Sequence, residues 1–103
     1  MANYLLVFHG GSMPESPEEG ARVMQAWNDW FAAIGDALVD GGNPASQTKS
    51  IAANGAVSDV VAGPSGYSII KAGSIEAAVG LAKGCPVLQG GASIEVVETF
   101  NAM

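Results

Sequence analysis

Hydrophobic residues near the N-terminus form a short continuous run. Residues 4–9 (YLLVFH) combine aromatic and β-branched side chains, which are typical of strands. Gly10 and Gly11 follow and predict that the strand ends in a turn. No basic region precedes the apolar run, so we expect a strand here and not a signal peptide.

The next apolar residues recur at helical spacing and predict a helix over residues 17–38. These residues are Val23, Trp27, Trp30, Ile34 and Leu38, with Met24 and Phe31 beside them. Ser16 can cap the free N–H groups, Pro17 suits the first helical position, and Glu19 can complete a capping box. Residues 41–44 (GGNP) stop the helix or a short extended piece after it.

The middle of the chain predicts a β-hairpin. Residues 48–52 and 56–61 flank Asn54-Gly55, a pair that accepts the positive φ angles of the tightest hairpin turns. Both strands are short and rich in alanine, so they are weak strand formers.

The last third of the chain predicts a strand, a helix and a strand. Residues 67–72 form a clear strand. Ser74 then caps a second helix over residues 75–83, which Gly84 terminates. Residues 93–100 complete the pattern as the last strand.

This order of elements predicts one α+β domain over residues 1–103. It fits the ferredoxin-like split βαβ plan, in which two helices cover one face of a single antiparallel sheet. Strand alternation places Leu5, Val7, Ile69 and Val97 on the other, uncovered face if Tyr4, Leu6 and Phe8 face the helices. An apolar uncovered face predicts a homodimer that pairs sheet to sheet.

Composition narrows the possible partners. The chain is 49% hydrophobic, 14% charged and carries a net charge of −6, and its four basic residues are scattered. Nucleic acids and anionic membrane surfaces both need a basic patch, so we expect neither as a partner. No apolar run reaches transmembrane length. Cys85 is the only cysteine, which excludes an intramolecular disulfide and favours a reduced, cytoplasmic protein.

Four segments of the chain resemble the YCII-related family. They are GYSIIKA (66–72), SIEAA (74–78), KGCP (83–86) and GGASIEV (90–96). The N-terminal strand and the tryptophan-containing first helix are also similar to that family. The similarity is most specific in the C-terminal third and looser across residues 45–65.

The resemblance implies a dimeric α/β barrel in which two ferredoxin-like sheets face each other. Most members of the family are uncharacterised. Some relatives carry an acid–base pair of a first-helix histidine and an aspartate, and a few are lyases or isomerases. This chain departs there, because Met24 and Gln25 lie about where the histidine would be. The DGPF segment of another branch is replaced by residues 62–65 (AGPS).

His9 is the only histidine and therefore the first candidate for proton transfer near neutral pH. It ends the first strand, beside the expected starts of the two strands that contain Tyr67 and Glu95. If strand parity holds, these three side chains converge at one mouth of the barrel. A carboxylate beside an imidazole can stabilise its charged form or fix its tautomer. Alternatively, His9 caps a strand end in contact with solvent.

Other residues have weaker chemical signals. Trp27 and Trp30 pack in the core and interface, or one indole walls a ligand pocket together with Tyr67 and Ser93. Cys85 follows a helix C-terminus, where the dipole disfavours a thiolate, so we expect a buried structural thiol. The glycine pairs lack nucleotide-binding spacing and the aspartates lack metal-ligand spacing, so we expect no cofactor and no metal. Residues 40–43 (DGGN) form a turn or line a pocket.

These observations leave three hypotheses for function. The first is a dimeric barrel whose cavity binds a small, partly apolar molecule. The second is a cofactor-free lyase or isomerase that uses His9, with Glu95, as general acid or base. The third is a dimerisation module. A pocket lined by His9, Tyr67 and Glu95 would favour the enzyme, and a filled barrel would favour the module.

Overall fold

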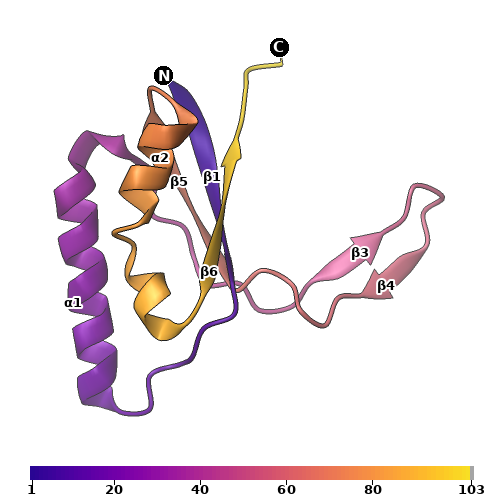
Figure 1. Ribbon diagram of the computed structural model, residues 1–103. Helices are drawn as coiled ribbons and strands as arrows, with labels where there is room; N and C mark the ends of the chain where they lie inside the picture. The colour runs from indigo at the N-terminus through magenta and orange to yellow at the C-terminus, as the bar shows by residue number, and fades with distance from the viewer. Residues whose placement is uncertain (103) are drawn as a thin grey trace.

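The computed structural model of the chain describes residues 1–102 as an α+β protein with two α-helices and two antiparallel sheets. The main sheet has four strands in the order β2-β5-β1-β6, formed by β2 (Leu38–Asp40), β5 (Gly66–Ala72), β1 (Ala2–His9) and β6 (Ser93–Glu98). All three neighbouring pairs are antiparallel. Helices α1 (Pro17–Ile34) and α2 (Ile75–Ala82) both lie on one side of this sheet (Figure 1).

Alternation along β1 determines which side chains face the helices. Tyr4, Leu6 and Phe8 are buried, whereas Leu5 and Val7 between them are half-buried on the opposite face. Leu5 stands opposite both Ile69 of β5 and Val97 of β6. The predicted division of the strands between the two faces is therefore confirmed. We call Leu5, Val7, Ile69 and Val97 the open face.

Helix α1 begins as predicted but ends earlier than residue 38. The Ser16 hydroxyl accepts a hydrogen bond from the Glu19 N–H at 3.1 Å. The Glu19 carboxylate accepts one from the Glu15 N–H at 3.3 Å, in place of the reciprocal bond to Ser16 that a capping box requires. Gly35 ends the helix with φ 54° and ψ −122°, a conformation that L side chains rarely adopt.

The residues that follow α1 form a 3₁₀ turn, η1 (Gly35–Ala37), and then the edge strand β2. The apolar spacing predicts a helix that continues to Leu38, because that residue follows the same spacing. In the structure Leu38 instead pairs with Ile70 across β2 and β5. The prediction of helix at residues 35–38 is therefore wrong, since a glycine at positive φ overrides the apolar period.

The predicted hairpin is confirmed but does not join the main sheet. Within the described residues, strands β3 (Lys49–Ile51) and β4 (Val57–Asp59) pair only with each other, in a second, two-stranded sheet. Gly55 has φ 91°, as expected, but Asn54 does not have a positive φ. The Gly55 N–H donates to the Ala52 carbonyl at 2.8 Å, so the turn is longer than the two-residue Asn-Gly turn that the sequence predicts. The main sheet is an open one in the single chain, and no closed barrel is present among residues 1–102.

Helix α2 is short and packs through small residues. The Ser74 hydroxyl caps it by accepting from the Ala77 N–H at 3.1 Å, as predicted. Ala78 and Ala82 are fully buried against the sheet. A 3₁₀ turn, η2 (Pro86–Gly90), then leads to β6. In the part of the chain described, no helix is long and apolar enough to cross a membrane.

Candidate functional site

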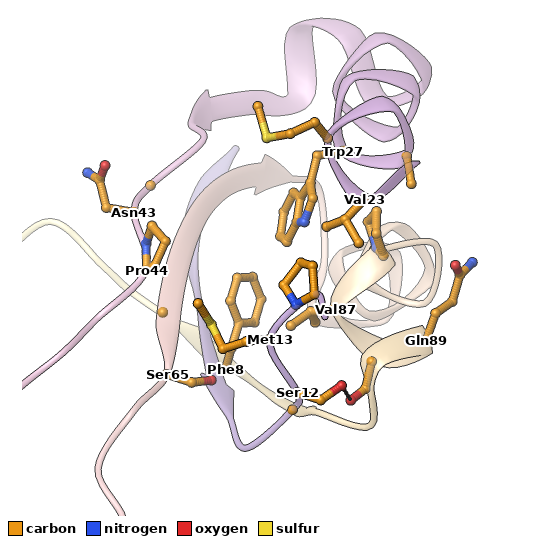
Figure 2. Close-up of a pocket in the computed structure, with 18 of the residues that line it drawn as sticks. Phe8, Ser12, Met13, Val23, Trp27, Asn43, Pro44, Ser65, Val87 and Gln89 are labelled. Carbon is orange, nitrogen blue, oxygen red and sulfur yellow. Dashed lines mark hydrogen bonds between the residues drawn. The ribbon is translucent and has the colours of Figure 1, made fainter. Parts of the chain in front are cut away.

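A hollow of about 810 Å³ lies on the helix side of the sheet, beneath the N-terminal half of α1. Figure 2 shows the rings of Phe8 from β1 and Trp27 from α1 pointing into it, with Met13 beside Phe8. The Phe8 and Trp27 ring centroids are 5.8 Å apart, and those of Trp27 and Phe31 are 5.6 Å apart. The hollow therefore has an aromatic floor, which suits an apolar or aromatic ligand.

The two tryptophans, predicted as a pair, have different environments. Trp30 is buried, and its indole N–H donates to the Leu81 carbonyl at 3.0 Å, which fastens α1 to α2. Trp27 is half-buried and borders the hollow. The packing interpretation thus applies to Trp30, and the pocket interpretation applies to Trp27.

Two of the loops that line the hollow are held in place by hydrogen bonds. The linker after β1 is fixed where the Ser12 N–H donates to the Gly90 carbonyl at 3.1 Å. The turn after β2 is fixed where the Ser68 hydroxyl donates to the Gly41 carbonyl at 2.8 Å and the Tyr67 N–H to the Asn43 carbonyl at 3.3 Å. Within residues 40–43 the Asp40 carboxylate accepts a hydrogen bond from the Gly42 N–H at 2.8 Å, so the expected turn is present. The turn also lines the hollow through Gly41, Gly42 and Asn43.

Polar side chains stand among the lining residues. Arg22 and Glu19, one turn apart on α1, supply one charge of each sign. The Glu19 carboxylate is engaged by the Glu15 N–H, whereas Arg22 forms no ion pair within residues 1–102. The hollow can therefore offer an available guanidinium to a polar group on an otherwise apolar ligand.

His9 and Glu95 meet on the opposite side of the sheet. The His9 Nε2 atom lies 2.5 Å from the Glu95 Oε1 atom. Their side chains are 35% and 68% exposed, so water screens the pair and its net stabilisation is small. The predicted approach of these two residues follows directly from the strand register, since His9 pairs with Ser93 and Val7 with Glu95.

The hollow does not lie beside His9, where a pocket was predicted. Neither His9 nor Glu95 lines the hollow, and the exposed Ser93 does not line it either. Tyr67 stands opposite Val7 on the open face and is also one of the residues that line the hollow. The structure therefore separates Trp27, which borders the hollow, from the His9–Glu95 pair on the opposite side of the sheet.

Cys85 is a buried thiol, as expected, although the cause of its low acidity differs from the prediction. Burial raises the pKa of Cys85 to about 11, and a hydrogen bond from the backbone of Val87 partly opposes this shift. Desolvation, and not the helix dipole, is thus the dominant cause. Elsewhere in residues 1–102, no three histidine, cysteine or acidic side chains gather closely enough to hold a metal ion.

The residues that sequence reasoning missed are Phe8, Met13, Val23 and Val87 as walls of one hollow. Their apolar character gives no signal that separates a pocket wall from a core residue. Comparisons with family models, with curated proteins and with solved structures find no match. The site is therefore interpreted from its own geometry.

Proposed function

We propose that this chain binds a small, partly apolar molecule in the hollow beneath α1. The observation that carries this proposal is the aromatic floor of Phe8, Trp27 and Phe31 under a hollow of about 810 Å³. This volume is within the range of about 300–1,000 Å³ that small-molecule sites occupy. The first half of α1 makes room for the ligand, since Val23 and Met24 on it are exposed and do not pack on the sheet.

The lining favours a ligand with a flat apolar body and one polar end. Aromatic side chains bind such a body by offset or edge-on stacking. Arg22 is placed to receive a carboxylate or another acceptor at the polar end. The ligand class is therefore a small aromatic or alkyl compound that carries a single acceptor group.

Two indole resonances provide a direct test, because the chain has two tryptophans. Phenylacetate and its neutral analogue phenylacetamide are titrated into the ¹⁵N-labelled protein. We expect both probes to shift the Trp27 indole resonance, phenylacetate at lower concentration. The Trp30 resonance should shift less, because its N–H is bonded to the Leu81 carbonyl, although its ring contacts Trp27 at 5.7 Å between centroids. The Ala26→Phe variant fills the hollow and should abolish the shift.

The matched control is Ala33→Phe, an exposed position on the same helix that does not line the hollow. It should bind both probes as the unmodified chain does. A Trp27 resonance that neither probe moves at millimolar concentration would contradict the proposal and favour the dimerisation module. Unchanged binding by Ala26→Phe would place the site elsewhere.

We also propose that the chain is a YCII-related protein with a ferredoxin-like fold that forms a homodimer. Support comes from the strand order β2-β5-β1-β6 and from the two helices on one side of the sheet. The open face supports the homodimer, because Leu5, Val7 and Ile69 are only half-buried and Val97 is exposed. Pairing of two open faces would give the dimeric barrel that the resemblance implies.

The His9–Glu95 contact favours a second candidate function, acid–base catalysis in a cofactor-free lyase or isomerase. A carboxylate that accepts a hydrogen bond from one imidazole nitrogen leaves the other nitrogen to take up a proton. In a homodimer built on the open face, this pair would lie at the margin of the interface. A site there would be separate from the hollow.

A further inference from the structure

The β3–β4 hairpin extends from the body of the protein like an arm. Figure 1 shows it projecting from one end of the main sheet, on the side away from both helices. Every residue of its two strands is exposed. An isolated two-stranded hairpin is at best marginally stable in water. Within residues 1–102 the arm therefore lacks the packing that would stabilise it.

The two faces of this arm differ in polarity. Ile51 stands opposite Val57, and Lys49 stands opposite Asp59 on the same face. Ser50 and Ser58 form the other face. Ile51 is 72% exposed and Val57 is 64% exposed, although both are large apolar residues. This apolar face is the surface that a partner would cover.

The surface area of the chain indicates how much a partner would cover. The chain exposes 6988 Å², whereas a monomer of this mass is expected to expose about 5,400 Å². Its radius of gyration is 15.1 Å, against about 13 Å for a compact domain of this length. The excess of about 1,600 Å² per chain exceeds the roughly 800 Å² that each partner contributes to a standard interface.

Charge favours a second copy over a charged partner. Lys49 and Asp59 form an ion pair on the arm, so residues 46–61 carry no net charge in a chain of net charge −6. The arm is therefore a segment that a second acidic chain can approach without strong repulsion. A two-fold axis would give each arm an equivalent site on the other chain.

We propose that the β3–β4 arm of each chain packs, through Ile51 and Val57, on a second copy of the protein. This inference rests on the homodimer proposed above. The arm projects to the side of the sheet that the helices leave open, so a copy docked on the open face comes within its reach. One partner then covers both exposed apolar surfaces of the chain, and an intermolecular contact stabilises the arm.

The experiment measures the dimer dissociation constant of the full chain by sedimentation equilibrium. The variant Ile51→Thr/Val57→Thr keeps strand-forming side chains but removes the apolar face. We expect it to weaken the dimer at least about tenfold. The control Ser50→Thr/Ser58→Thr changes the opposite face of the same hairpin and should leave the constant within about twofold.

The possible outcomes distinguish the arm proposal from the proposal that two open faces pair. A dimer whose dissociation constant is the same in the unmodified chain and in Ile51→Thr/Val57→Thr would overturn the arm proposal while keeping the homodimer. A chain that is monomeric at micromolar concentration would overturn both. If Leu5→Lys leaves the dimer intact while the arm variant dissociates it, the arm proposal stands and the open-face dimer is wrong.

Discussion

At the scale of single residues, the His9–Glu95 contact predicts which imidazole nitrogen of His9 carries the proton. The Glu95 carboxylate lies 2.5 Å from His9 Nε2, and a carboxylate can only accept. Neutral His9 is therefore expected to carry its proton on Nε2 and to keep Nδ1 free as a base. Because the chain has one histidine, its imidazole ¹⁵N resonances need no assignment.

We predict that these resonances report the Nε2–H tautomer at a pH where His9 is neutral. Glu95→Gln removes the charge while keeping the size of the side chain, so the tautomer ratio should move toward an even mixture. Glu98→Gln, which removes a charge from the same strand without touching His9, should change nothing. Observation of the Nδ1–H tautomer in the unmodified protein would remove the basis for an Nδ1 base.

Strand parity explains why this pair could be predicted from sequence. Side chains alternate along β1, so His9 shares a face with Leu5 and Val7 once Tyr4 is placed in the core. The hollow could not be predicted in the same way. Its floor joins Phe8 of β1 to Trp27 of α1, and nothing in these apolar side chains distinguishes a pocket floor from a filled core.

At the scale of elements, one glycine decides where α1 stops and β2 starts. Gly35 adopts φ 54° and ψ −122° at the end of α1. Gly35→Ala forces a side chain into this conformation, and we expect a loss of about 1–3 kcal/mol in the free energy of unfolding. Equilibrium unfolding in urea measures the change, with all variants compared at one protein concentration.

The control is Gly80→Ala within α2, where no atom lies within 4 Å of the added Cβ. Alanine suits a helix interior better than glycine, so this variant should gain about 0.5–1 kcal/mol. Equal stability of Gly35→Ala and the unmodified chain would show that residues 35–37 can continue the helix. The apolar spacing that runs through Leu38 would then be the stronger signal.

Most elements were predicted correctly because helix-capping and turn residues are recognised by their own chemistry. Ser16 and Ser74 both cap helices with their hydroxyl groups, and Asn54-Gly55 forms the hairpin turn. The failure at residues 35–38 arose because apolar spacing cannot report the φ angle of a glycine. The separation of the β3–β4 arm from the main sheet was not predictable either, since pairing partners are chosen by tertiary packing.

At the scale of the whole molecule, the proposed homodimer links stability to concentration. The single chain exposes 6988 Å² and leaves both the open face and the arm uncovered, so the proposed dimer would add apolar burial to the folded state. Unfolding of a dimer yields two chains, so mass action raises the melting temperature as protein concentration rises. For a chain of this length, the expected rise is about 3 °C for each tenfold increase.

We predict that Leu5→Lys removes this concentration dependence, because it places a charge at the centre of the open face, opposite Ile69 and Val97. Ala33→Lys on the exposed side of α1 adds the same charge away from that face and should keep the rise. The control is necessary because an added lysine reduces the magnitude of the net charge of −6 and would by itself favour association. Differential scanning calorimetry over a hundredfold range of concentration makes the comparison. A melting temperature of the unmodified chain that stays constant across this range would mean that the open face is a solvent-facing surface of a monomer.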